Sequence, residues 1–368
     1  MFQEFDVHSL YGHMQAFAAY SYFLLSDSRP FQVSDATYAG SGSYTSHLAA
    51  HSYRDWTHLR YSIAGMMRMN MYGVTHTGSD VCGFYGNLNQ ELCGRWMQLA
   101  TVYPLARNSY NATVSEAGVQ PGEPYLLEEP YKSMARNALY DRLELSRYLY
   151  TQMWESTLSQ GAIIQPLFYL WPAIDELYTD IEQTFMFGKR LLVLPVLEAS
   201  ATLLKVFLPA GSYVNLWNYQ DVLAVDVAKQ VEIAVSNDHL SIYLPPGAIA
   251  VRQLNSEKKL KTTADFLSKA KTTLVANRDG NKQATGELFL DDGSSYTSIG
   301  LLEFDYYQFQ LQANTLHRWI QNDGVGTGVF FDTPNKFLEQ LVIVNAEDMA
   351  TYDFACAVNN EKAGSVPV

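Results

Sequence analysis

The sequence predicts an α/β region followed by an all-β region. In the first half, segments with the helical spacing of apolar residues alternate with short apolar runs, which is typical of parallel strands covered by helices. Near residue 190 the pattern changes to short β-type runs separated by Gly and Pro turns. A polar, Lys-rich stretch at 256–263 is the expected linker. We therefore expect three units, over residues 1–188, 189–253 and 254–368.

The first half contains four helical segments and three strands in alternation. Apolar residues three or four positions apart predict helices over 8–26, 56–71, 87–102 and 128–159. The last is one long helix or a pair, with Pro130 in its first turn. Strands are expected at 29–33, 74–80 and 163–169.

The second half is predicted to be β-structure throughout. Strands are expected at 191–197, 203–208, 212–217, 231–235 and 240–244. A further β region starts near residue 254, and its clearest strand ends at the turn Asp291-Asp292-Gly293. We expect this turn to terminate the strand rather than to bind calcium.

Composition limits the classes of partner. A formal net charge of −13 disfavours nucleic acid and anionic membrane surfaces. No run of eighteen apolar residues is present, so no membrane span is expected. The segment 1–6 lacks a basic region followed by an apolar one, so we expect no signal peptide there. The 25 Tyr suit core packing, sugar stacking or a protein interface.

The cysteines and one sequon point to an oxidising compartment. Cys82 and Cys93 flank a short Gly/Asn-rich loop, which permits a local disulfide. We expect a structural disulfide rather than a metal site, because no second Cys pair or His cluster accompanies them. Cys356 is expected to be a free thiol. Asn111-Ala112-Thr113 is an acceptor for N-glycosylation.

A series of motifs occurs in order along nearly the whole chain. The loop over 42–56 carries Gly42, Tyr44, His47 and Trp56. The other motifs are His8-Ser9-Leu10-Tyr11-Gly12, Arg29-Pro30-Phe31, Gly78-Ser79-Asp80-Val81-Cys82-Gly83-Phe84, Glu91-Leu92-Cys93, Arg95-Trp96-Met97-Gln98-Leu99, Tyr103-Pro104, Arg107-Asn108 and Gly286-Glu287-Leu288-Phe289. In residues and spacing this series resembles glycoside hydrolase family 31, the α-glucosidase family.

This resemblance implies the second half of a (β/α)₈ TIM barrel, followed by proximal and distal β-sandwich domains. The family's active site lies at the carboxyl ends of the barrel strands. Half a barrel leaves two strand edges open, so the resemblance implies a partner chain that completes or covers it. It implies no cofactor and no metal, and a secretory, lumenal or extracellular location.

The family's retaining mechanism uses two carboxylates about 5–5.5 Å apart. The nucleophile motif Trp-x-Asp-Met-Asn is absent from the 368 residues, and the acid/base position is His51. An imidazolium beside a developing oxocarbenium ion opposes the charge that such a site must stabilise. The resemblance therefore implies no catalytic residue in this chain.

The predicted sugar-binding positions are altered as well. The family's Arg, Trp and His fall at Asp35, Leu48 and Ser109. Asp80 and Phe84 match its substrate-binding Asp and Phe, and Asp80 either binds a residual ligand or caps a turn. His47 and His76 are expected to be hydrogen-bonded structural histidines.

These changes favour a catalytically inactive α-glucosidase-like protein with a structural or assembly role. One alternative is a fragment or subunit of an active retaining α-glucosidase whose nucleophile lies elsewhere. The other is a non-catalytic carbohydrate-binding protein that retains Asp80 and Phe84 as a weak site.

Overall fold

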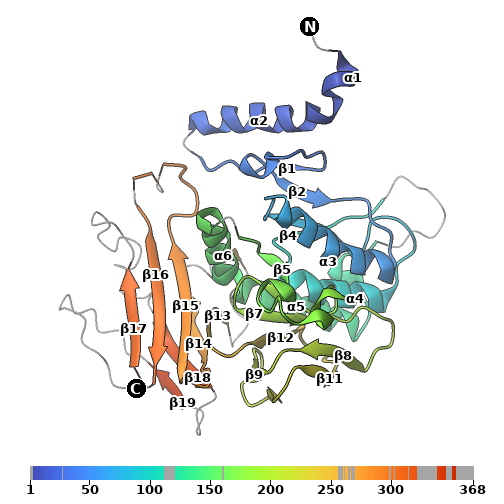
Figure 1. Ribbon diagram of the computed structural model, residues 1–368. Coiled ribbons are helices and arrows are strands. Elements are labelled where there is room, and N and C mark those ends of the chain that lie inside the picture. The colour runs from blue at the N-terminus through green and yellow to red at the C-terminus, as the bar shows by residue number, and fades with distance from the viewer. Residues whose placement is uncertain are drawn as a thin grey trace.

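The computed structural model describes most of the chain and joins an α/β part to several β sheets (Figure 1). The expected α/β class followed by all-β structure is therefore confirmed. Cys356 and most of the predicted linker 256–263 lie outside the described residues. The described residues are 3–26, 28–111, 121–159, 161–255, 260, 262–263, 266, 270–297, 300–301, 303–313, 315–320, 338–344 and 350–353.

The α/β part is a partial barrel built on four parallel strands in the order β1-β2-β3-β4. Its strands are β1 (Val33–Ser34), β2 (Ser46–Ala49), β3 (Thr77–Val81) and β4 (Leu105–Asn108). Its helices are α1 (Glu4–Val7), α2 (Tyr11–Phe23), α3 (Trp56–Met71), α4 (Gln90–Leu99), α5 (Tyr131–Glu144) and α6 (Ser146–Ser159). The segment 128–159 is thus a pair of helices. Within the described residues, β1 and β4 remain unpaired on their outer sides, which confirms the open sheet.

Local sequence explains where the two central helices begin. Asp55 is the N-cap of α3 and accepts a hydrogen bond from His58 N at 2.7 Å. Asn89 caps α4 in the same way, accepting from Leu92 N at 3.0 Å. Gly78 lets β3 approach β4, because a Cβ there would lie 1.5 Å from Leu105 O. The two caps mark where the loops after β2 and β3 end, and these loops carry part of the candidate site.

The predicted strand at 163–169 forms, but not as a parallel barrel strand. β5 (Ile164–Pro166) pairs antiparallel with β6 (Phe185–Phe187). The Asn70 side chain accepts from Ile163 N at 2.7 Å and Ile164 N at 3.0 Å, so these donors are satisfied without a parallel neighbour. The expectation of uniformly parallel strands in this half is therefore wrong at β5.

The β half contains three sheets. Six strands follow the order β10-β9-β12-β7-β6-β5, two the order β11-β8, and seven the order β17-β16-β15-β13-β14-β18-β19. The strands not yet bounded are β7 (Leu191–Leu194), β8 (Leu203–Leu208), β9 (Gly211–Asn215), β10 (Val222–Val225), β11 (Lys229–Ala234), β12 (Ser241–Leu244), β13 (Ala248–Leu254), β14 (Lys271–Asn277), β15 (Gln283–Leu290), β16 (Asp305–Gln312), β17 (Thr315–Ile320), β18 (Leu338–Val344) and β19 (Ala350–Asp353).

Candidate functional site

The sequence-predicted site residues gather at one edge of the parallel sheet. Asp35 follows β1, His51 follows β2, Asp80 is near the end of β3 and Phe84 lies just beyond it, and Ser109 follows β4. Because the four strands are parallel neighbours, their carboxyl ends meet at the same edge. Leu48 differs, since it lies inside β2 and is buried.

The Asp80 carboxylate accepts hydrogen bonds on both oxygens, one from the loop after β2 and one from β4. Its side chain is fully buried. Oδ2 accepts from the backbone N of His51 at 2.8 Å, and Oδ1 accepts from Arg107 Nε at 2.7 Å. Arg107 stands opposite Asp80 in the β3–β4 register. The carboxylate thereby ties the loop after β2 to β4, and this favours the structural interpretation of Asp80. Ligand binding by Asp80 stays a prediction.

His51 adopts a backbone conformation that limits which residues fit there. Its φ is 65°, in the left-handed region where Asn, Asp and His are enriched. Asp and His both tolerate this conformation, so either residue is compatible with the backbone of the loop. The exposed imidazole lies edge-on to Phe84, with ring centroids 4.8 Å apart, and 6.0 Å from Tyr85.

The loops after β2 and β3 are joined by backbone hydrogen bonds. Phe84 N and Tyr85 N donate to Ser52 O at 2.7 and 3.0 Å, and Arg54 N donates to Tyr85 O at 2.9 Å. Gly83 permits this approach, because a Cβ there would lie 2.8 Å from Tyr53 O. No pattern in the sequence indicates this pairing, since it joins segments about thirty residues apart.

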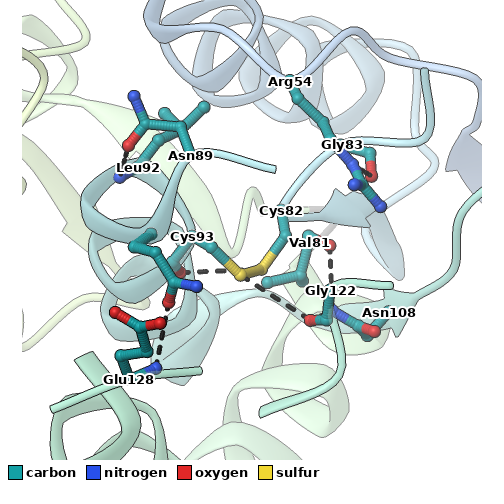
Figure 2. The surroundings of a disulfide bond; sticks show 11 residues. Arg54, Val81, Cys82, Gly83, Asn89, Leu92, Cys93, Asn108, Gly122 and Glu128 are labelled. Carbon is teal, nitrogen blue, oxygen red and sulfur yellow. Dashed lines mark hydrogen bonds between the residues drawn. A yellow bond between two sulfur atoms is a disulfide. The ribbon is translucent and has the colours of Figure 1, made fainter. Parts of the chain in front are cut away.

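The predicted disulfide between Cys82 and Cys93 is present and fixes the base of the second loop (Figure 2). It connects the residue after β3 to α4. Asn108 Nδ2 donates to Val81 O at 3.2 Å and to Gly122 O at 3.0 Å beside it. The two cysteines are 11 positions apart. If a disulfide acts mainly by lowering the entropy of the unfolded chain, closing a loop of this length raises the free energy of unfolding by about 3 kcal/mol. The disulfide thus holds the turn that carries Phe84 and Tyr85.

Two other positions that the resemblance predicts to be altered, Asp35 and Ser109, lie at the same edge. Asp35 is exposed, and its charge partly offsets the burial that lowers the pKa of His47. Ser109 is half-buried. Asn111, the sequon residue, donates its backbone N to Phe84 O at 3.0 Å. Glycosylation at Asn111 stays a prediction.

His76 lies directly before β3, at the amino ends of the strands and opposite the candidate site. Its Nδ1 lies 2.6 Å from Ser46 Oγ. Burial lowers its pKa, the hydrogen bond to the Pro104 carbonyl opposes this, and the charge of Arg142 adds to the lowering. In the part of the chain that the structure describes, no group of three His, Cys, Asp or Glu is placed to hold a metal ion.

Two surface hollows lie elsewhere. One is lined by residues such as Leu167, Thr184 and Phe207, and the other by residues such as Arg60, Pro195 and Leu204. Both lie against the β sheets and include none of the predicted site residues, so we assign no function to them.

Comparison with known families agrees with the partial barrel and its β sheets. Residues 1–152 match the TIM-barrel domain of glycosyl hydrolases family 31, and residues 160–250 match the C-terminal domain of glycosyl hydrolase family 31. The chain belongs to glycosyl hydrolase family 31.

Several of its curated relatives are α-glucosidases of greater length. A probable alpha-glucosidase of Oryza sativa subsp. japonica is 36% identical over 299 residues, which cover 81% of this chain and 32% of the relative. The lysosomal alpha-glucosidase of Bos taurus is 30% identical over 386 residues, covering 99% of this chain and 38% of that protein. The chain thus spans about a third of the length of these relatives.

Solved structures give the same fold. The glucosidase II alpha subunit superposes with a TM-score of 0.84 at 25% identity, over 94% of this chain and 37% of that chain. The ER glucosidase II heterodimeric complex, which consists of a catalytic subunit and the binding domain of the regulatory subunit, matches with a TM-score of 0.83 at 25% identity, over 93% and 37% of the two chains. No helix among the described residues is both long and apolar enough to cross a membrane.

Proposed function

We propose that this chain is a family 31 α-glucosidase-like protein that does not hydrolyse glucosides by the family's two-carboxylate mechanism and that has a structural role with a partner protein. The observation that carries the proposal is His51. We assign this exposed imidazole to the position that the resemblance gives to the family's acid, and the nearby Asp80 carboxylate is already hydrogen-bonded to Arg107 and the His51 backbone.

The chemical argument rests on charge. A general acid contributes typically 10²–10⁴-fold to such a reaction. A protonated imidazole can donate a proton, but it also places a positive charge beside a cationic transition state. Asp35, Leu48 and Ser109 change the surrounding charge and shape in the same region, which supports loss of catalysis over altered specificity.

The alternative is a fragment or subunit of an active α-glucosidase. It requires that another segment supply the nucleophile and that a group other than the family's Asp donate the proton. The two hypotheses differ in what His51 does, because only an active enzyme would depend on it or be improved by restoring the acid.

Hydrolysis of two substrates by three versions of the chain tests the proposal. Maltose has a poor leaving group and needs the acid, whereas p-nitrophenyl α-glucoside needs it far less. We expect the native chain, His51→Asp and His51→Ala all to remain at the uncatalysed rate with both. Turnover by the native chain that falls in His51→Ala would overturn the proposal. Activity gained on maltose by His51→Asp would show that a nucleophile is in place and would favour the alternative.

The proposed partner would cover an apolar surface at the N-terminal edge of the sheet, which we call the N-terminal surface. Large apolar side chains are exposed there, on α1, α2 and the segment leading into β1. Beyond them lies the unpaired outer side of β1. A partner with apolar side chains and an available strand would satisfy both. The N-terminal surface comprises Phe5, Tyr11, Met14, Phe17, Tyr22, Phe23, Leu25, Phe31 and Val33.

We further propose that the chain functions in a secretory, lumenal or extracellular compartment. The Cys82–Cys93 disulfide supports this, since such bonds persist in oxidising environments. The family includes a lysosomal α-glucosidase and an ER glucosidase II, each by its own name. A mass decrease on treatment with a peptide N-glycosidase, absent in Asn111→Gln, would support both the compartment and the modified residue. An unmodified Asn111 in protein isolated from its natural source would contradict the sequon prediction.

A further inference from the structure

Helix α2 has two faces that differ in what they contact. On the inner face Ala16 is buried, and its carbonyl accepts from Gln32 Nε2 at 2.9 Å. His13 Nδ1 on the same face lies 2.9 Å from Ser41 Oγ. Because residues three or four positions apart share a face of a helix, the side chains opposite these point away from the contact. This outer face is a row of exposed side chains, which we call the α2 stripe: Tyr11, Met14, Ala18, Tyr22 and, in the 3₁₀ turn Leu24–Ser26 that continues the helix, Leu25.

The α2 stripe is open to solvent but carries no charge. Tyr11 is 68% exposed, Tyr22 is 72% exposed and Leu25 is 84% exposed. Residues 8–26 contain no Asp, Glu, Lys or Arg. A helix at the surface of a soluble protein ordinarily presents charged and polar side chains on its outer face. The α2 stripe therefore has the composition of a surface that another protein covers.

The spacing of the α2 stripe is the same when it is read in either direction. Its members are 3, 4, 4 and 3 positions apart, with Ala18 at the centre. Two antiparallel copies of the helix that cross at Ala18 would therefore place Met14 of one copy against Tyr22 of the other, and Tyr11 against Leu25. The small side chain of Ala18 lets the two helix axes approach at the crossing point. Such a contact is a closed twofold interface, because both copies use the same surface.

We propose that the α2 stripe binds a second copy of this chain through an antiparallel pair of α2 helices that cross at Ala18. The inference rests on the proposed structural role and identifies the partner as another copy. Each copy has a net charge of −13, so self-association is favoured at a surface where neither copy contributes a charged side chain. Since α2 has thirteen residues and is about 20 Å long, the other apolar side chains of the N-terminal surface would add to the buried area.

Sedimentation velocity of the full chain, from about 1 to about 100 µM, tests the proposal. We expect a monomer–dimer equilibrium in the micromolar range. Ala18→Arg should weaken dimerisation roughly 100-fold or more, because the twofold axis places the two guanidinium groups against each other. Ala18→Glu should do the same, and an equimolar mixture of the two variants should dimerise again.

Both new side chains are good helix formers, and Ala18 is exposed, so the variants should stay folded. Leu158→Arg is the matched control. Leu158 is 59% exposed on α6, outside the α2 stripe, so the same added charge there should leave dimerisation unchanged.

Cysteine cross-linking tests the direction of the two helices. Residues 14 and 22 are 8 positions apart, which is about 12 Å along a helix and more than a disulfide spans. In an antiparallel pair, Ala18→Cys should cross-link to itself, whereas Met14→Cys should cross-link when it is mixed with Tyr22→Cys but not alone. All three are combined with Cys356→Ser, which removes the thiol of Cys356.

Several outcomes overturn the proposal. A native chain that stays monomeric at about 100 µM is one, and a dimer that Ala18→Arg leaves intact is another. Cross-linking of Met14→Cys to itself would contradict the antiparallel direction. A monomeric chain that binds a different protein, and that Ala18→Arg releases from it, would assign the α2 stripe to that protein instead. Hydrolysis of maltose by the dimer would overturn the proposed loss of catalysis and leave the dimer interface standing.

Discussion

Helices α4 and α2 belong to the same partial barrel but have opposite relations to their surroundings. α4 is enclosed, with all residues from Leu92 to Leu99 buried and packed against α5 and the sheet. α2 has thirteen residues, all described, and buries Ala16 alone. Figure 1 shows α2 at the outer margin, above β1. The partial barrel therefore exposes apolar side chains along α2 at its β1 edge, whereas the apolar residues of α4 are buried.

The contrast also explains what holds α2 in place. The rings of His13, Phe17 and Tyr20 on α2 contact Tyr44 in the loop before β2. The segment that follows α2 is anchored by Arg29. Arg29 donates to Asp291 Oδ2 at 2.8 Å, to the Ser295 carbonyl at 2.9 Å and to Tyr150. Asp291 and Ser295 belong to the turn after β15, so the β region fixes the edge that the barrel part leaves open.

Removing a large side chain from each helix should give the largest difference. Trp96 in α4 is completely buried and donates Nε1–H to Tyr103 Oη at 3.1 Å. We expect Trp96→Ala to lower the free energy of unfolding by about 3–5 kcal/mol. Phe17→Ala in α2 should lower it by less than about 1 kcal/mol, because Phe17 is 42% exposed. Urea unfolding followed by circular dichroism measures both.

Equal losses in the two variants would contradict the proposed difference between enclosed and open helices. Phe17→Glu should leave the isolated chain folded while preventing association with a partner at the N-terminal surface. If the partner bound Phe17→Glu as tightly as the native chain, the assignment of that surface would be wrong.

Much of the fold is predictable because it depends on local patterns. The apolar stripe Leu59, Ile63, Met66 and Met67 predicts α3 with its observed bounds, and alternation does the same for β8. The antiparallel partner of β5 is not predicted, because a three-residue apolar strand does not indicate its neighbour. β10 is not predicted either, since it has four residues, two of which are exposed.

The sequence predicts where the site residues lie, but not which hydrogen bonds and ion pairs they form. Motifs place Asp80, Phe84 and His51 near one another, and parallel strands do bring them to one edge. The ion pair of Asp80 with Arg107 depends on the β3–β4 register, which no motif encodes. The close approach of the loops after β2 and β3 depends on Gly83, and no motif indicates it.

A smaller effect is expected from weakening the ion pair of Arg29 with Asp291, which anchors the segment after α2. Asp291→Asn keeps the shape of the side chain and removes the charge that pairs with Arg29. We expect a local loss of about 2 kcal/mol, because hydrogen bonds to buried charged groups contribute about this much. Amide hydrogen exchange at 28–34 should accelerate roughly 30-fold, and exchange in α4 should not change. Glu232→Gln, which alters an exposed pair with Lys205, is the control. Unchanged exchange at 28–34 would mean that α2 is held by other contacts.

The smallest expected effect is on the pH dependence of stability, which should have opposite signs for His76 in the α/β part and His239 in the β half. Burial lowers the pKa of His76 below its ordinary value of 6.5, so the unfolded chain takes up a proton more readily than the folded one. The stability that His76 contributes is complete above pH 6.5 and is lost as the pH falls toward its folded pKa.

The pKa of His239 is shifted in the opposite direction. Burial alone would lower its pKa, but the hydrogen bond and charge of Asp141 raise it, so its contribution is complete below pH 6.5 and is lost as the pH rises through the folded pKa. Thermal unfolding midpoints between pH 7.5 and 5.5 should therefore fall less in His76→Asn than in the native chain and more in His239→Asn. The same pH slope in both variants would show that the pKa values of His76 and His239 are not shifted in opposite directions by folding.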